Sequence, residues 1–280
     1  MGKTSLNAIF AHPIIEAMNP YVHNFTAVRW LSNDLNPYSA IQIGAGIAFM
    51  NNISHLKEVV AFGMMKEDYQ NGRYNGIDTL VVPSINDNIA QATAILAPAF
   101  GIERVQSVAP GEKASRPMRG SLFFDQYSHP GNAHIHEECT GPQLLRSAGT
   151  IGMIVVVLDS GGTAIGLSRY LKTACTDTIV LGVRPGRNES IPGAQNAEQM
   201  KRSGTLPYEP MIDEIVEVGF GEAIFGMHKI SKKVYPNPGL SSGMAYMGMM
   251  KCLRLSPDMR EVLFGRRVIF VCPDRSPPRL

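Results

Sequence analysis

The sequence predicts an α/β fold built on a parallel β-sheet, and three observations lead to this prediction. Short runs rich in β-branched residues alternate along the chain with longer runs of helical periodicity. The strongest run, residues 151–158, is apolar on both faces, as a central strand of a parallel sheet should be. Strand, helix and strand follow one another, which implies right-handed crossovers and helices on both faces of the sheet.

Each expected element carries its own local signal. Thr79–Pro83 ends in a turn-forming proline, and residues 87–100 form a helical pattern that Asn86 or Asp87 caps and a glycine follows. Residues 109–120 are basic, rich in proline and glycine and without periodicity, so they predict an exposed loop. The remaining predicted strands are 104–108, 178–183 and 268–272, and the remaining predicted helices are 164–174 and 242–253.

The composition argues against several classes of protein. The chain has 280 residues and a formal net charge of +2, and no block of like charges suggests binding to nucleic acid or to an anionic membrane. None of the four cysteines sits in the closely spaced pairs of a zinc site, so no metal is expected. The first residues do not resemble a signal peptide, and no apolar run is long enough to span a bilayer. We therefore expect a cytoplasmic protein with reduced thiols.

A glycine turn follows the strongest predicted strand. It leads directly into a predicted helix and consists of Asp159, Ser160, Gly161, Gly162 and Thr163. The N–H groups of such a turn can approach an anion closely, and the helix dipole favours negative charge there, so the turn predicts a phosphate site. It is neither a Walker loop nor a GxGxxG motif, and by itself a Gly-Gly turn more often serves tight packing. Asp159 would repel a phosphate unless its carboxylate turns away or caps the helix.

Several blocks of the chain resemble the cysteine synthase and cystathionine β-synthase family, and they occur in the family's order. Residues 159–172, DSGGTAIGLSRYLK, resemble the family's GTGGT turn and the helix after it. Residues 126–143, QYSHPGNAHIHEECTGPQ, match the family's Q-[FY]-S-N-P-x-N-x-x-x-H-x-x-T-x-G-P-E stretch without a gap. The other blocks are EAMNP at 16–20, SIPGAQNAEQM at 190–200, IDEIVEVGFGEAI at 212–224, GLSSGM at 239–244 and the closing strand with its tail at 268–280.

This resemblance implies a type II pyridoxal phosphate (PLP) fold, with two three-layer domains built on parallel sheets and the cofactor in the cleft between them. Residues 1–36 and 126–280 would form the larger domain. Residues 37–125 would form a smaller one, reduced because the stretch before residue 121 is shorter than the family expects. The resemblance also implies a substrate that is serine or O-activated serine, a reaction of β-elimination followed by β-replacement, and a homodimer.

The matched positions suggest which residues would hold the cofactor. Four residues of the turn would bind its phosphate through backbone N–H and hydroxyl groups: Ser160, Gly161, Gly162 and Thr163. Ser241, the first serine of GLSSGM, would face the pyridine nitrogen, although a serine at this position also suits a helix N-cap. Asn86 would contact the phenolic oxygen of the cofactor.

The predicted substrate loop departs from the family. The family's T-S-G-N-T-G loop appears here as residues 83–88, in which Ile85 and Asn88 replace both glycines. Ser84 and Asp87 would lie near the substrate carboxylate, where the negative charge of Asp87 should oppose binding. Gln126 would lie near the same carboxylate, or else be a solvated polar residue.

The family's cofactor-binding lysine sits in the pattern N-P-x-x-S-V-K-D-R, and alignment to Asn19-Pro20 with two residues of the pattern dropped places His23 at the lysine position. An imidazole cannot form the stable imine that a lysine amine forms with the PLP aldehyde. We therefore expect PLP to bind noncovalently at most, unless another lysine reaches the cleft. His23 would then act as a general base, or be simply a polar residue at a helix start.

Two functions remain open from the sequence. The first is a PLP-dependent β-replacement or β-elimination enzyme with impaired activity, resembling cysteine synthase, which makes cysteine from O-activated serine and sulfide. The second is a catalytically inactive relative that keeps the fold to bind a small molecule or a partner protein, as His23 and Asp87 suggest. For the enzyme, the expected substrate is a small amino acid.

Overall fold

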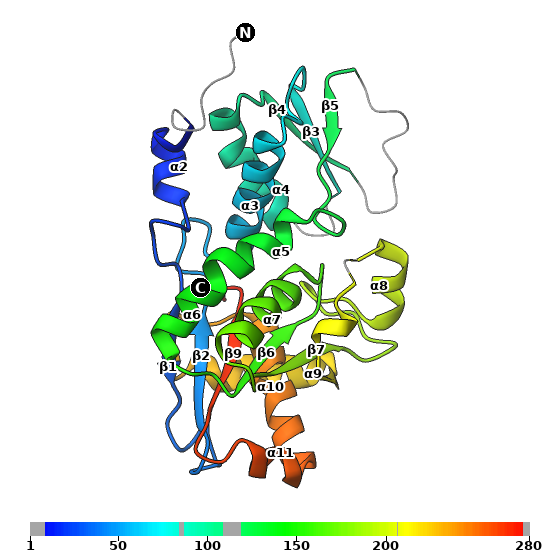
Figure 1. The fold of residues 1–280 in the computed structure, drawn as a ribbon. Helices are drawn as coiled ribbons and strands as arrows, with labels where there is room; N and C mark the ends of the chain where they lie inside the picture. Colours follow the sequence, from blue (N-terminus) through cyan, green and yellow to red (C-terminus); the bar gives the residue numbers. More distant parts are fainter. Residues whose placement is uncertain (1–8, 84–86, 109–118, 206, 277–280) are drawn as a thin grey trace.

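The computed structural model describes residues 9–83, 87–108, 119–205 and 207–276, and it confirms the α/β class. Within these residues the strands form a six-stranded sheet and a three-stranded sheet. In Figure 1 the smaller sheet lies above the larger one, and helices pack beside both. No helix in the described ranges combines the length and the apolarity that crossing a bilayer requires.

The larger sheet has the strand order β1-β2-β9-β6-β7-β8 and is parallel except for the pair β1 and β2. Ile154 of β6 and Ile269 of β9 belong to the core on one face, while Val155 and Phe270 belong to the core on the other. This burial on both faces explains why β6 is apolar throughout. The strands are β1 Ala27–Trp30, β2 Gln42–Ile47, β6 Met153–Val157, β7 Ile179–Pro185, β8 Glu214–Val218 and β9 Arg267–Cys272.

The smaller sheet has the order β4-β3-β5, and both of its strand pairs are parallel. Helices α3 and α4 pack against one another beside it. Pro98 has no backbone N–H to continue helix α4, so a 3-10 turn, η1, completes the predicted helix. The elements are β3 Thr79–Pro83, β4 Arg104–Val108, β5 Ser121–Phe123, α3 Lys57–Gln70, α4 Asp87–Leu96 and η1 Ala97–Phe100.

Two helices cover opposite faces of the larger sheet. Helix α7, Gly162–Ala174, buries Leu167 in the core that contains Ile154. Helix α10, Leu240–Leu255, buries Met244 in the core that contains Val155. The remaining helices are α2 Pro13–Met18, α5 Gly131–Ile135, the π-helical η2 His136–Thr140, α6 Gly141–Ala148, α8 Ala197–Ser203, the 3-10 turn η3 Glu209–Met211, α9 Phe220–Ser231 and α11 Pro257–Val262.

The predicted strands and helices are present, but the predicted boundary between the domains does not follow the sheets. Strand β2 pairs with β9 from Gln42 to Ile47, so residues expected in the smaller domain belong to the larger sheet. The two strands are far apart in the sequence, and no local pattern predicts their pairing. Residues 109–118, most of the predicted loop, lie outside the described residues.

Candidate active site

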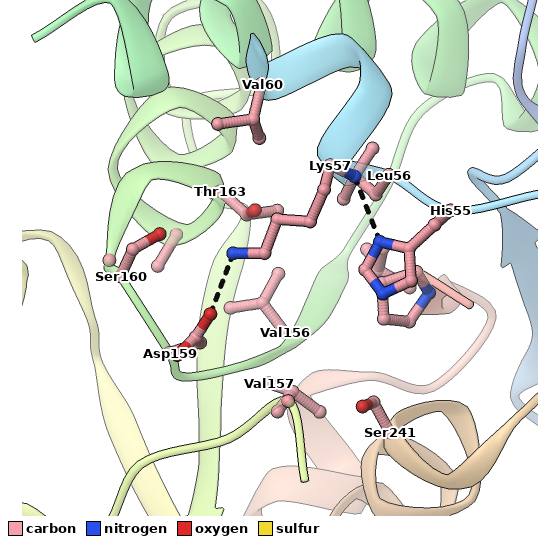
Figure 2. Close-up of a pocket in the computed structure, with 15 residues that line it drawn as sticks. His55, Leu56, Lys57, Val60, Val156, Val157, Asp159, Ser160, Thr163 and Ser241 are labelled. Carbon is pink, nitrogen blue, oxygen red and sulfur yellow. Dashed lines mark hydrogen bonds and ion pairs between the residues drawn. The ribbon is translucent and has the colours of Figure 1, made fainter. Parts of the chain in front are cut away.

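A pocket lies at the carboxyl ends of the adjacent strands β6 and β9, a place where parallel sheets commonly bind ligands. Segments far apart in the sequence meet there, among them the starts of α3, α7 and α10. Figure 2 shows the side chains that line it. They are His55, Leu56, Lys57, Val60, Val156, Val157, Asp159, Ser160, Gly161, Thr163, Ala164, Gly193, Ser241, Val271 and Pro273.

Lys57 brings an amino group into this pocket. It is the first residue of α3 and is only 8% exposed. Its Nζ donates to Asp159 Oδ2 at 2.7 Å and to Gln126 Oε1 at 2.6 Å. Figure 2 shows the side chain extended toward Asp159. Among the described residues that line the pocket, Lys57 carries the only amine and Asp159 the only carboxylate, so this pair is the charged centre of the pocket.

The glycine turn predicted from the sequence forms one wall of the pocket. Gly161 precedes α7 with φ at +83°, a left-handed conformation that favours glycine. A Cβ on Gly162 would lie 2.1 Å from Oδ1 of the buried Asn132, so a larger residue does not fit without a shift. Asn132 Nδ2 also donates to Ser160 Oγ at 2.8 Å. The stretch at 126–143 thus holds the turn and places the first amides of α7 at the pocket.

Two histidines near Lys57, the half-buried His55 and the buried His136, are neutral. Burial, and after it the positive charge of Lys57, lowers the pKa of both His55 and His136 to about 3. His55 Nδ1 accepts the backbone N–H of Lys57 at 3.0 Å, which leaves the ring proton on Nε2. His136 Nε2 lies 3.1 Å from Thr163 Oγ1 and so orients a hydroxyl that lines the pocket.

Ser241 and Gly193 form another part of the wall. Gly193 has φ at +79°, and a Cβ there would lie 2.8 Å from Ser241 Oγ. The carboxylate of Asp274 accepts the backbone N–H groups of Ser241 at 3.4 Å and Ser242 at 3.3 Å. Asp274 therefore caps the start of α10, and the Ser241 hydroxyl faces the pocket instead of capping the helix.

We expect the two histidines to make the fold less stable in acid. Their pKa is about 6.5 when unfolded and about 3 in the fold, so between these values the unfolded chain binds protons that the fold excludes. Each histidine then lowers the free energy of unfolding by up to about 1.4 kcal/mol per unit fall in pH. Urea unfolding measured from pH 7 to pH 4 tests this expectation.

A His136→Gln variant isolates this effect from other titrating groups. Burial raises the pKa of Glu58 and of Asp274, which acts in the opposite direction, but these two carboxyl groups are common to both proteins. The variant should therefore lose less stability than the wild type between pH 7 and pH 4. Identical losses in the two proteins would contradict the prediction.

Most of the predicted site residues meet at this pocket. The following line it or adjoin it at the start of α7: Ser160, Gly161, Gly162, Thr163 and Ser241. Gln126 is buried rather than solvated, and it accepts a hydrogen bond from Lys57. Asp87 is the first residue of α4. Two predicted residues lie outside the described part of the chain: Ser84 and Asn86.

His23 does not lie at the pocket, contrary to the alignment that gave it the lysine position. Its side chain is exposed, and its Nε2 lies 2.8 Å from the carbonyl oxygen of Glu16. The pocket does contain a lysine, Lys57, so an amine reaches the site from a segment that the alignment did not consider. The correction follows from the tertiary structure, which brings the start of α3 rather than the segment after α2 to the glycine turn.

The sequence did contain a signal for Lys57. Asn51 and Lys57 keep the spacing of asparagine and lysine in the N-P-x-x-S-V-K-D-R pattern, and the acidic Glu58 follows where the pattern has aspartate. The alignment chose Asn19-Pro20 instead because the proline is kept there. Asn132 was also missed, because its contact with the glycine turn exists only in the folded chain.

The chain is similar to known proteins in sequence and in fold. Residues 102–274 match the family model for pyridoxal-phosphate dependent enzymes. The chain is 25% identical over 199 residues to cysteine synthase B of Salmonella typhimurium, a match that covers 68% of this chain and 63% of that relative. It is 23% identical over 283 residues to a cysteine synthase of Staphylococcus aureus, covering 85% of this chain and 87% of that relative. The match to the Salmonella protein thus spans less than two thirds of that protein's length.

The fold is also similar to a solved structure. The crystal structure of an O-acetylserine dependent cystathionine β-synthase from Helicobacter pylori superposes with a TM-score of 0.75 at 20% identity, covering 94% of this chain and 96% of that one. The similarity extends over both sheets, which supports the type II fold. Because the family model matches more than half of its residues, the chain belongs to the family of pyridoxal-phosphate dependent enzymes.

Proposed function

We propose that the chain is a PLP-dependent enzyme of the cysteine synthase type, which replaces the β-substituent of an O-activated serine, and that Lys57 forms the bond to the cofactor. The observation that carries this proposal is the Lys57 amine inside the pocket that the glycine turn also lines. A lysine amine beside an anion-binding helix start is the pair of groups that PLP requires.

The residues of the pocket fit this cofactor. Helix α7 has 13 residues, and its first amides lie with the hydroxyls of Ser160 and Thr163 at the pocket wall, where they can donate to a phosphate. The Ser241 hydroxyl suits a pyridine nitrogen. Gln126 Nε2 is buried and has no hydrogen-bond partner among the described residues, so it is a donor available to a substrate carboxylate.

Side chains of the pocket supply proton transfer and exclude water. When bound, PLP supplies an aldehyde that joins covalently to an amine and a ring that accepts electrons. Lys57 Nζ, held by Gln126, is the group in the pocket that takes up and returns protons. His55 and His136 do not compete for those protons, because they stay neutral. An apolar wall limits the entry of water and is formed by Val60, Val156 and Val271.

The reason for expecting impaired activity changes with the structure. It rested on His23 and Asp87. His23 lies outside the pocket, whereas Lys57 supplies the amine that the alignment lacked. What favours an inactive relative is Asp159, whose carboxylate pairs with that amine at 2.7 Å. We therefore keep ligand binding without turnover as a second candidate function.

A reduction experiment tests the proposal. The protein is incubated with PLP and desalted, and its visible spectrum is recorded before and after borohydride treatment. We expect a yellow chromophore that reduction fixes to the peptide containing Lys57, as mass mapping will show. A colourless protein, or a label on another lysine such as Lys66, would contradict the assignment. Formation of cysteine from O-acetylserine and sulfide then distinguishes the enzyme from a protein that only binds the cofactor.

A further inference from the structure

We infer that Asp159 is a positioning residue that holds the Lys57 amine as an ammonium ion, and that it thereby limits how tightly the pocket binds PLP. This inference rests on the proposed function. The GTGGT pattern has glycine where this chain has Asp159, so the carboxylate is a departure at the first position of the turn. Its partner is the same amine that must bond to the cofactor.

The ion pair is short and sheltered from solvent. Lys57 Nζ and Asp159 Oδ2 lie 2.7 Å apart, and the two side chains are only 11% and 15% exposed. The same Nζ donates to Gln126 Oε1 at 2.6 Å. An ammonium group has three donors and no lone pair, so it satisfies both acceptors at once. The surroundings of Lys57 therefore suit its charged, unreactive form.

The other titratable groups around Lys57 and Asp159 carry no charge that would weaken this ion pair. His55, just before α3, and His136 in η2 are neutral, because burial lowers the pKa of each to about 3. Tyr127 also feels the charge of Asp159, and burial followed by that charge raises its pKa, so its hydroxyl stays protonated. Among the described lining residues, Lys57 alone provides a positive charge to balance Asp159.

Bonding to PLP works directly against this pair. Lys57 must first lose one proton to water, which exposes the lone pair of its nitrogen. That lone pair forms a bond to the aldehyde carbon, and the carbonyl oxygen leaves as water with the two remaining amine protons. The resulting C=N nitrogen can no longer donate to both Asp159 and Gln126.

The phosphate of PLP adds a second conflict. Asp159 directly precedes the turn that would hold it, and like charges repel strongly in a sheltered site. Asp159 thus opposes both the loss of a proton from the Lys57 amine and the binding of the PLP phosphate. The first effect acts through Lys57 and depends on the aldehyde, whereas the second depends only on the phosphate, so two ligands can separate them.

The test compares wild type with Asp159→Asn and Asp159→Ser in equilibrium titrations with two ligands. One ligand is PLP, and the other is pyridoxine 5′-phosphate, which has an alcohol in place of the aldehyde. Removing the carboxylate is expected to tighten PLP binding about tenfold, the effect of one sheltered charge. Pyridoxine phosphate should gain less, because only the repulsion is relieved. Thermal unfolding verifies that each variant is folded, and the serine variant serves if the asparagine variant is not.

Asp34→Asn is the charge-matched control. It removes a carboxylate from the exposed ion pair with Lys233, whose atoms lie 3.3 Å apart, and should leave both affinities unchanged. Equal gains for the two ligands would overturn the claim that Asp159 acts through Lys57. Wild-type binding of PLP with no tighter binding in the folded Asp159 variants would overturn the inference but leave the proposed function intact. Failure of every protein to bind PLP would overturn both.

Discussion

Replacement of Lys57 by alanine is expected to abolish covalent attachment of PLP and to lower kcat/KM at least about 100-fold, since both the cofactor bond and a proton-transfer group are lost. No other amine lies among the described residues that line the pocket. The variant also leaves the sheltered Asp159 carboxylate without its cation, which should lower the free energy of unfolding by about 2 kcal/mol. Borohydride labelling, steady-state kinetics and urea unfolding measure the three effects.

Lys57→Arg separates the chemistry from the stability. A guanidinium keeps a positive charge near Asp159 but cannot form the cofactor bond, so stability should largely return while the covalent label and the activity stay absent. Lys66→Ala is the matched control on the same helix, because Lys66 pairs with Glu138 at 3.3 Å and does not line the pocket. A reducible chromophore that survives in Lys57→Ala would show that another residue bonds to the cofactor.

Gly162→Ala is expected to lower both stability and cofactor affinity. The added Cβ would lie 2.1 Å from Asn132 Oδ1 and 2.3 Å from its Cγ, and Asn132 is completely buried. Overpacking of this kind typically costs about 1–3 kcal/mol. Any displacement of Asn132 also disturbs the side chain that holds Ser160 Oγ and the Gln126 carbonyl oxygen, so PLP titration and urea unfolding should both report the change.

Gly221→Ala provides the comparison for this substitution. Gly221 also lies in the first turn of a helix, α9, but a Cβ there meets no other atom within 4 Å. Alanine should leave stability unchanged or raise it slightly, because it loses less backbone entropy than glycine in a helix. If Gly162→Ala behaved like Gly221→Ala in both measurements, the proposed fit of the turn against Asn132 would be wrong.

The elements of the fold could be predicted where their signals are local. Strand β6 was recognisable because its residues are buried on both faces, and helix α7 because its periodicity begins after a glycine turn. The partner of β2 was not recognisable, since its register with β9 joins Gln42 to Arg267 and depends on the whole chain. An apolar strand indicates that both of its faces are buried, but it does not identify the distant segments that pack against them.

The same distinction applies to the site. The sequence by itself determined the α/β class, the turn from Asp159 to Thr163 and the residues available for a phosphate. Tertiary structure decided which basic residue faces that turn: Lys57 contacts Gln126 across 69 positions and Asp159 across 102. Two asparagine-containing runs resemble the lysine motif: the one at Asn19 keeps its proline, and the one at Asn51 keeps its spacing. Burial of the Lys57 amine beside a distant carboxylate arises only when the sheets and helices pack.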